Sequence, residues 1–371
     1  MTKSANVLPN KIQLGELFSG PGGIATGAFR AAAELEMDLG HAWAIDYDKD
    51  SCFTYARNVL KSKDDVLPNS VLNRSVTDVQ FETLPEIQAL AFGFPCNDFS
   101  MVGEKKGTLG DFGPLYSYGV KALNAHSPLF FVAENVGGLR SSKTASGGSA
   151  LSMIIDELEA AGGRYTVYPH YYKFEDYGVP QTRHHVILVG IRNDIAGDVG
   201  YKIPAPTHLG KHKSVSQALK GIKAGKARWK NNELTKQSAS VIARLECINP
   251  GENAWNSTIN DPKLRLNVKN VRMSQIYRRL HPDQPSYTVT GSGGGGTHVY
   301  HWEEPRALTN RERACIQTFP RSYEFYGSKE SVRKQIGMAV PPDGARVVFR
   351  SILMSLTRQP YDWIPSNMPN V

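Results

Sequence analysis

Apolar and polar positions alternate in two different ways along the first half of the chain. Short apolar runs that end in polar or glycine-rich residues have the length of strands, whereas longer stretches repeat apolar positions at helical spacing. Strands that alternate with helices are typical of a parallel α/β sheet. We therefore predict strands at 12–18, 41–46, 89–94 and 129–135, a weaker strand at 71–76, and helices at 23–37 and 149–163.

The pattern changes in the second half. Residues 164–172 and 184–192 have the pattern of two further strands, which we expect to form a hairpin-like pair. Beyond Arg192 the periodicity weakens until 308–319, where Thr309 and Glu312 have the spacing of a helical capping box. A last helix is predicted at 342–358. We therefore expect a first domain at 1–198, a second at 199–320, and a segment at 321–371 that packs back on the first domain.

The charge distribution indicates an anionic partner. The 371 residues carry a net charge of +8. Residues 207–280 contain 15 Lys and Arg against 4 Asp and Glu, a net charge of +11, which leaves −3 for the rest of the chain. Positive charge concentrated in one segment suits a nucleic acid better than it suits general solubility.

Composition also excludes several classes. There is no apolar run of about 18 residues and no secretory signal, so we expect no membrane span. Four scattered cysteines without a C-x-x-C pair favour a reducing cytosol over a disulfide scaffold or a zinc site. We therefore expect a cytoplasmic protein that binds no metal.

A glycine-rich turn follows the first predicted strand. Residues 18–23 read FSGPGG, and Asp46 ends the next strand. Such glycines bring backbone N–H groups close to a ligand, and an acid at the second strand end can bind the hydroxyls of a ribose. The pair predicts an adenosine-containing cofactor, with a plain βα turn as the alternative. The spacing G-x-G-G differs from the G-x-G-x-x-G of dinucleotide sites, which disfavours NAD.

Two reactive side chains stand at further strand ends. Cys96 follows the strand at 89–94, and Glu134 ends the strand at 129–135. A thiolate held by nearby N–H groups is a strong nucleophile, and a buried carboxyl group can donate a proton. Each residue alone is as well explained by a core cysteine or an ordinary strand-end acid.

The order of the motifs decides between these interpretations. FSGPGG, Asp46, FPCNDFS at 94–100, ENV at 134–136 and QTR at 181–183 follow one another along the chain. After the basic segment come RRLHPDQPSYTVT, PRALTNRERACIQTFP and IGMAVPPDGA. From Leu14 to about Leu356, except in the basic segment, the chain resembles the DNA (cytosine-5)-methyltransferase family, in particular its prokaryotic restriction-modification type.

The resemblance implies a Rossmann-like S-adenosylmethionine-dependent methyltransferase domain and a smaller target-recognition domain. The cofactor would be S-adenosyl-L-methionine, with S-adenosyl-L-homocysteine as product. Phe18 would pack on the adenine, Asp46 would hold the ribose, and Asp78 would reach the adenine amino group. The implied cofactor-binding residues are Phe18, Ser19, Gly20, Pro21, Gly22, Gly23, Asp46, Tyr47, Asp78, Val79, Pro95, Met338, Ala339 and Val340.

The resemblance also implies a mechanism. The thiolate of Cys96 would attack carbon 6 of a cytosine flipped out of duplex DNA, Glu134 would contact ring nitrogen 3, and Arg183 would hold the exocyclic oxygen. The basic segment would read the target sequence, and the loop after Cys96 would close over the DNA. The residues we expect at the DNA are Ser100, Lys105, Lys106, His185, Arg228, Lys230, Arg272, Arg278, Arg279, Gly293 and Gly294.

Three positions depart from the family pattern. Asn97 replaces a glutamine, His185 replaces the second arginine of Gln-x-Arg-x-Arg, and Met338 replaces an asparagine. We expect the contact of His185 to be altered and pH-dependent, and cofactor binding to be weakened by Met338. Rival interpretations are the tRNA-methylating branch of the family, a catalytically silent DNA-binding protein and a nicotinamide-dependent oxidoreductase.

The expected setting follows from the same resemblance. We expect a monomer in the bacterial cytosol, associated with the nucleoid, whose partner is duplex DNA. A restriction endonuclease would recognise the same DNA sequence, without forming a complex with this protein.

Overall fold

The computed structural model describes residues 11–94, 115–142, 147–266, 274–294 and 296–368. They form two compact units. Unit 1 comprises residues 1–173, 184–206 and 344–371, and unit 2 comprises 174–183 and 207–343. The chain thus returns to unit 1 at Gly344, later than the segment boundary at 321 that the sequence suggested.

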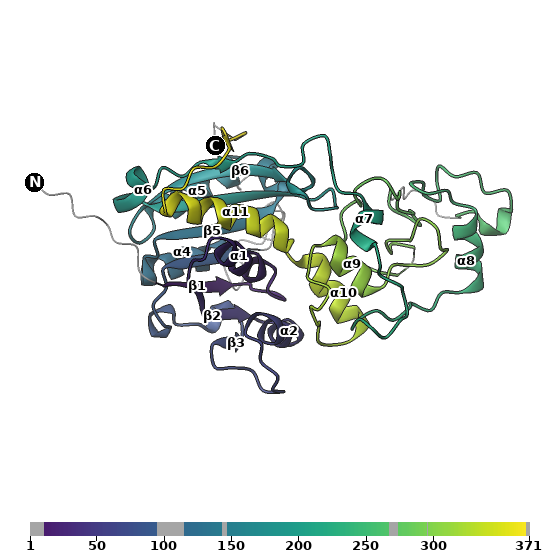
Figure 1. Ribbon diagram of the computed structural model, residues 1–371, viewed down its shortest axis with the longest axis horizontal. Coiled ribbons are helices and arrows are strands. Elements are labelled where there is room, and N and C mark those ends of the chain that lie inside the picture. The colour runs from purple at the N-terminus through teal and green to yellow at the C-terminus, as the bar shows by residue number, and fades with distance from the viewer. Residues whose placement is uncertain (1–10, 95–114, 143–146, 267–273, 295, 369–371) are drawn as a thin grey trace, which may run out of the picture. The chain divides into compact units, whose positions relative to one another are not determined.

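Unit 1 is built on a seven-stranded sheet with the strand order β3-β2-β1-β4-β5-β7-β6 (Figure 1). Its first five strands are parallel, as predicted. They are β1 (Ile12–Leu17), β2 (Leu39–Asp46), β3 (Val71–Asn73), β4 (Ala89–Gly93) and β5 (Phe130–Val136). The carboxyl ends of parallel strands lie at one edge of a sheet, so the predicted strand-end residues share that edge.

Helices cover both faces of this sheet because its central strands are apolar on both sides. Helices α4 (Tyr116–His126) and α5 (Ala150–Ala160) pack on the face that carries Phe131 and Leu188. Helices α1 (Gly23–Glu34) and α11 (Pro342–Leu356) lie together on the other face (Figure 1). There the rings of Phe130 and Phe349 meet at 6.1 Å, and Arg346 of α11 pairs with Glu34 of α1 at 3.1 Å.

The strands β6 (Tyr165–Lys173) and β7 (His184–Arg192) pair antiparallel over nine residues, which confirms the predicted hairpin-like pair. β7 is also antiparallel to β5. The ten residues 174–183 that join the two strands belong to unit 2, so the connection is no tight turn.

Smaller elements complete unit 1. Helix α2 (Lys49–Val59) and the 3-10 turns η1 (Val76–Asp78) and η2 (Phe81–Thr83) follow β2 and β3. The turn η4 (Gly137–Ser141) follows β5, and α6 (Asn193–Val199) follows β7. The short strands β8 (Ile203–Pro204) and β9 (Trp363–Ile364) pair antiparallel.

Unit 2 has little regular structure around two apolar clusters. Its elements are the turn η5 (Phe174–Tyr177), the helices α7 (Val215–Leu219), α8 (Ala239–Glu246), α9 (Asn310–Ile316) and α10 (Lys329–Met338), and the turn η6 (Pro262–Leu264). The predicted capping box is confirmed. The Thr309 hydroxyl accepts from the Glu312 amide, and the Glu312 carboxylate accepts from the Thr309 amide.

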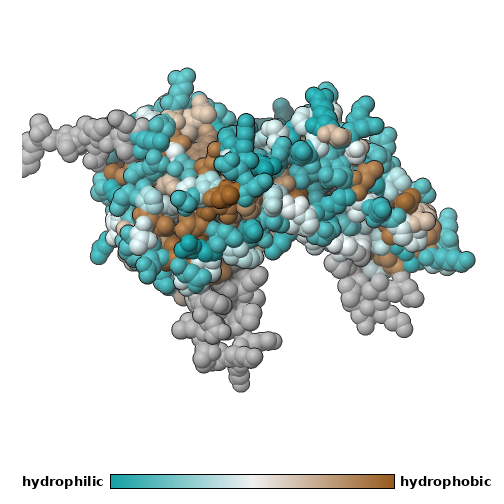
Figure 2. All heavy atoms as spheres, turned by 90° about the horizontal axis from the view of Figure 1, so that it is seen from below, coloured by the Kyte–Doolittle hydropathy of each residue, from teal (hydrophilic) through white to brown (hydrophobic). Residues whose placement is uncertain are grey.

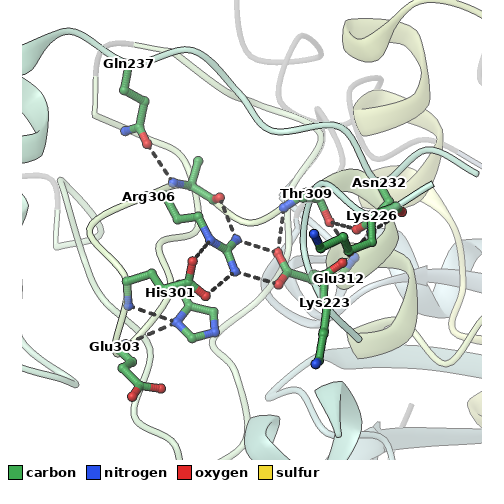
Figure 3. A network of polar contacts seen from close by, with 11 residues as sticks. Lys223, Lys226, Asn232, Gln237, His301, Glu303, Arg306, Thr309 and Glu312 are labelled. Carbon is green, nitrogen blue, oxygen red and sulfur yellow. Dashed lines mark hydrogen bonds and ion pairs between the residues drawn. The ribbon is translucent and has the colours of Figure 1, made fainter. Parts of the chain in front are cut away.

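A polar network holds the basic segment against α9 (Figure 3). Glu312 accepts two bonds from the Arg306 guanidinium, at 2.8 and 2.9 Å. The Thr309 hydroxyl donates to Asn232 Oδ1 at 2.9 Å, and the Asn232 amide group donates to the carbonyls of Lys223 and Lys226. The lysine-rich backbone at 223–232 is therefore fixed by bonds to buried polar groups, which leaves its lysine side chains outside this network.

The surface is mostly hydrophilic in the view of Figure 2, with apolar residues between the polar ones. Tyr47 and Met338 are among the large apolar side chains that are exposed. In the part of the chain that the structure describes, no helix has the length and apolar character needed to cross a bilayer. Within the same residues, no group of three His, Cys, Asp or Glu side chains is arranged to hold a metal ion.

Candidate active site

The turn between β1 and α1 takes its shape from backbone conformations that favour glycine. Gly20 and Gly22 have φ angles of 52° and 89°, and Phe18 adopts a φ of 54°. Gly22 is the N-cap of α1 and offers no side-chain cap, so the first amides of the helix are not capped by a side chain. A Cβ on Gly20 would meet no atom within 4 Å. The backbone at Gly20 therefore borders open space, where a ligand can approach it closely.

Asp46 connects this turn to the end of β2. Its carboxylate accepts from the Gly20 amide and the Asp48 amide, both at 2.8 Å. Asp46 is buried, whereas the neighbouring Tyr47 is 66% exposed. Asp78 ends the turn η1 beyond β3, where its carboxylate accepts from the Thr77 hydroxyl. The Gly20 turn and Asp46 thus meet at the ends of β1 and β2, and Asp78 lies in the turn that follows β3.

Glu16 is a buried acid that the sequence interpretation did not single out. It lies on β1 in the register row of Ala44 on β2 and Ala91 on β4. Both of its carboxyl oxygens are buried without a hydrogen-bond partner among the described residues. Burial raises the pKa of Glu16 to about 8, although the nearby Tyr55 hydroxyl opposes the shift. The sequence did contain a signal for this buried acid, because Glu16 stands within an otherwise largely apolar strand.

Glu134 lies near the end of β5, directly beside Gly93 of β4 in the register. A Cβ on Gly93 would come within 2.8 Å of Glu134 Oε2, so the glycine makes room for the carboxylate. Asn135 also ties the two strand ends, because its side-chain amide donates to the Phe94 carbonyl at 2.8 Å. The chain therefore leaves β4 for residues 95 and 96 from a point next to Glu134.

Several predicted residues lie outside the described part of the chain. They are Pro95, Cys96, Ser100, Lys105, Lys106 and Arg272. Among the described cysteines, burial raises the pKa of the Cys52 thiol to about 12 and also raises that of Cys315. Neither thiol is set up as a nucleophile near neutral pH.

His185 lies next to Glu134, and its ring Nδ1 is hydrogen-bonded to Glu134 Oε1. Both residues are buried. We predicted that His185 contacts DNA or the closing loop; among the described residues its ring contacts the Glu134 carboxyl group. The reason is register, since His185 of β7 stands opposite Val136 of β5, which places it diagonally beside Glu134 on the same face of the sheet.

Arg183 belongs to unit 2. It is buried, its guanidinium donates to the Val289 carbonyl at 3.2 Å, and its own carbonyl accepts from the Phe174 amide. Gln181 is held nearby, since its side chain accepts from the Val289 amide and donates to Gln317. The QTR motif is therefore anchored to the backbone at 289 and to the end of α9.

The three residues expected at the cofactor from the late motif also lie in unit 2. Met338 ends α10 and is 61% exposed, whereas Ala339 and Val340 are buried. The Gln317 side chain donates to the carbonyls of Ile336 and Ala339, which fixes the end of the helix.

The predicted DNA-contacting residues of unit 2 have different surroundings within the protein. Arg228 lies over the Trp229 ring and Arg278 over the Tyr287 ring, each at 5.0 Å. Lys230 uses its carbonyl to accept from Arg311, and Gly294 has a φ of 130°. Gly293 packs so closely on Arg333 that a Cβ would come within 2.4 Å of that guanidinium.

Arg279 needs a correction. It is buried, and its guanidinium donates to the carbonyls of Leu245, Ile248, His301 and Trp302 at 2.6 to 3.0 Å. Carbonyl groups thus occupy four of the five N–H donors of this guanidinium. Arg279 therefore holds the fold of unit 2 together, and it is not a residue that reaches for a phosphate.

The arrangement of motifs and strand ends agrees with the comparisons to known proteins. The family model described as C-5 cytosine-specific DNA methylase matches residues 12–354. This chain belongs to that family.

The similar proteins include restriction-modification enzymes. The Type II methyltransferase M.BbvI of Brevibacillus brevis is 53% identical over 96% of this chain and 94% of its own length. M.NgoFVII of Neisseria gonorrhoeae is 38% identical over 94% of this chain and 88% of its own. The chain is thus a DNA (cytosine-5)-methyltransferase of the restriction-modification type.

Solved structures confirm the fold. A protein described as a prophage-encoded DNA modification methyltransferase from E. coli superposes with a TM-score of 0.69 at 21% identity, covering 94% of this chain and all of the other. The Dnmt2 methyltransferase of S. pombe gives a TM-score of 0.54 at 16% identity, covering 93% and 98%. The predicted α/β methyltransferase fold is therefore confirmed.

Proposed function

We propose that this methylase transfers a methyl group from S-adenosylmethionine to carbon 5 of a cytosine flipped out of a specific duplex sequence, through a covalent bond to Cys96. The observation that carries the proposal is the pairing of Gly93 with Glu134. It brings a buried carboxylate to the point where the chain continues to Cys96, three residues after Gly93. An acid and a thiol at neighbouring strand ends suit attack on one flat ring.

The residues at the ends of β1 and β2 fit S-adenosylmethionine. The amides and glycines of 18–23 suit its polar groups, Asp46 suits the ribose hydroxyls, and the exposed Tyr47 ring suits the adenine. When bound, the cofactor supplies the methyl group.

The proposed chemistry assigns a separate task to each protein group. The Cys96 thiolate forms a bond to carbon 6, and the ring electrons shift toward carbon 5 and ring nitrogen 3. Glu134 donates a proton to ring nitrogen 3 and so stabilises the electron-rich ring. After carbon 5 is methylated, a water molecule takes its hydrogen as a proton, and the electron pair of that bond forms the double bond between carbons 5 and 6. The bond between carbon 6 and sulfur then breaks, nitrogen 3 returns its proton to Glu134, and Cys96 recovers its electron pair.

Unit 2 would read the DNA sequence. Its basic segment carries the net charge of +11, and Arg228 and Arg278 are held over aromatic rings rather than by carboxylates in the contacts described above. Phosphate contacts of this kind make binding salt-dependent. We also propose that the enzyme acts as a monomer in the bacterial cytosol, and that a separate endonuclease cuts the same sequence when it is unmethylated.

Adduct trapping tests this proposal. Bisulfite sequencing of a plasmid that expresses the gene gives the recognition sequence, and a duplex with 5-fluorocytosine at the target is then incubated with enzyme and cofactor. We expect a denaturation-resistant complex whose peptide map places the DNA on Cys96. Cys96→Ser should form no complex, and Cys52→Ser, the matched control at a buried thiol, should form as much as wild type. Full methylation by Cys96→Ser, or an adduct on another residue, would refute the proposal.

A further inference from the structure

Glu134 has two oxygens in different surroundings. Oε1 is hydrogen-bonded to the Nδ1 of His185 on one neighbouring strand. Oε2 lies toward Gly93 on the other neighbouring strand, which continues to Cys96. His185 of β7 thus holds one oxygen of the carboxyl group, and the other oxygen faces the backbone of Gly93 on β4, which has no side chain.

Two further titratable groups of the described residues lie near this pair on β6. Tyr172 stands opposite His185 in the register, and its hydroxyl is buried. The His170 ring contacts the Tyr172 ring at 4.7 Å. Burial lowers the pKa of His170 to about 4, so His170 is neutral near pH 7. Next to the pair, Asn135 is turned to the Phe94 carbonyl.

We propose that His185 is a positioning residue that decides which oxygen of Glu134 carries the catalytic proton. This inference rests on the proposed role of Glu134. A neutral imidazole with its proton on Nδ1 donates to Oε1, and the carbonyl oxygen of a carboxylic acid is a better acceptor than its hydroxyl oxygen. The acid proton then sits on Oε2, the oxygen on the side of Gly93.

The same contact serves the next step. When Oε2 gives its proton to ring nitrogen 3, Glu134 becomes a buried carboxylate, which is costly without a donor. The Nδ1 proton of His185 remains on Oε1 and stabilises that charge without being transferred. On elimination the proton returns from nitrogen 3 to Oε2. The protons therefore balance between Glu134 and the base, and His185 leaves the cycle unchanged.

Four variants of two histidines test the proposal. His185→Asn keeps an N–H donor near the position of Nδ1, and His185→Leu removes it. We expect kcat for methyl transfer to fall by about threefold in His185→Asn and by about 10- to 100-fold in His185→Leu, with KM for DNA unchanged in both. His170→Asn and His170→Leu, at the buried histidine on the same sheet, are matched controls and should keep the wild-type kcat.

A pH profile separates positioning from packing. His185→Arg places a permanent positive charge beside Glu134, which favours the ionised form of that carboxyl group over the protonated form. The fall of kcat on the alkaline side should therefore come at lower pH in His185→Arg than in wild type. His185→Asn, which cannot titrate, should match wild type, because the proposal requires a neutral ring. A wild-type profile that follows His185→Arg would overturn the neutral-ring assignment.

The outcomes distinguish this inference from the proposed function. If the wild-type enzyme forms no adduct on 5-fluorocytosine DNA, the proposed function fails. If wild type forms the adduct and His185→Leu retains full kcat while folded, only the role of His185 fails. A rise in KM with unchanged kcat would make His185 a DNA contact and would equally overturn the inference. Thermal unfolding identifies any variant that does not fold. If His185→Leu does not fold, the pH profiles of kcat of His185→Asn and His185→Arg still test the role of His185.

Discussion

Replacing Gly93 by alanine tests whether the position of the Glu134 carboxylate controls methyl transfer. The added Cβ would stand 2.8 Å from Glu134 Oε2, whereas ordinary contact begins at 3.4 Å. The oxygen must therefore move by about 0.6 Å, and a displacement of about 1 Å at a reacting group can cost about 100-fold in rate. We expect kcat to fall by about 10- to 100-fold.

The stability of Gly93→Ala should change little. The backbone of Gly93 is outside the left-handed region, so alanine fits without backbone strain. Removing glycine stabilises by about 0.4–1 kcal/mol through the unfolded chain. Forcing the Glu134 side chain off its rotamer costs about 0.5–1.5 kcal/mol, so the two effects nearly cancel. The variant should be a folded enzyme with a slow chemical step.

The assay pairs single-turnover methyl transfer with thermal unfolding. Gly138→Ala is the matched control, because a Cβ there meets no atom within 4 Å, and it should keep both rate and stability. Gly190→Ala is the contrasting variant, since its Cβ would lie 2.0 Å from the Phe131 ring, and it should unfold at lower temperature. A folded Gly93→Ala enzyme with the wild-type rate would refute the reasoning, because the carboxylate would then have moved without consequence.

Three further predictions follow from buried groups. Arg279→Met should lower the free energy of unfolding, measured in urea, by about 2–4 kcal/mol, because four carbonyls lose their donor. The slope of its DNA affinity against salt concentration should equal that of wild type, because no phosphate contact is lost; a shallower slope would contradict this. Brief alkylation at pH 7.5, read by mass spectrometry, should leave Cys52 unmodified because burial raises its pKa to about 12; labelling as fast as in a denatured sample would contradict this. Glu16 has a pKa raised from 4.5 to about 8, so the unfolded chain loses this proton first and stability falls as the pH rises from about 4.5 to 8. Urea titrations at pH 5 and 8 should therefore show Glu16→Gln losing less stability than wild type, by up to about 1.4 kcal/mol per pH unit across that window. Equal losses in the two proteins would mean that Glu16 is ionised in the fold.

Local features were the ones that the sequence could predict. The capping box at Thr309 and Glu312 depends on four consecutive residues, and it formed as expected. The parallel strands were recognisable because each buried strand is a short apolar run bounded by turn residues. Their ends carry Asp46 and Glu134, so the sheet edge that holds the candidate site was predictable as well.

Features that depend on distant pairing were not predictable. Arg278 and Arg279 are adjacent and look equivalent in sequence, yet one lies over the Tyr287 ring and the other is enclosed by four carbonyls. The difference comes from segments 22 to 34 residues away that supply those carbonyls. His185 was predicted at the DNA because only its position in the motif was visible. Its contact with Glu134 joins residues 51 apart and requires the register of β5 against β7.

That register explains why the apolar core and the chemistry of this methylase are inseparable. Successive side chains of a strand point to opposite faces, so a slip of one residue in β5 would turn Glu134 away from His185. The register is fixed by Phe131 and Ala133, which alternate with Glu134 and are buried with Leu188 under α4 and α5. Loss of packing at those positions would therefore disturb the carboxylate without touching it. Variants at Phe131 or Ala133 that leave the protein folded should for this reason reduce the rate of methyl transfer before they reduce DNA binding, which we propose depends on residues of unit 2 outside this sheet.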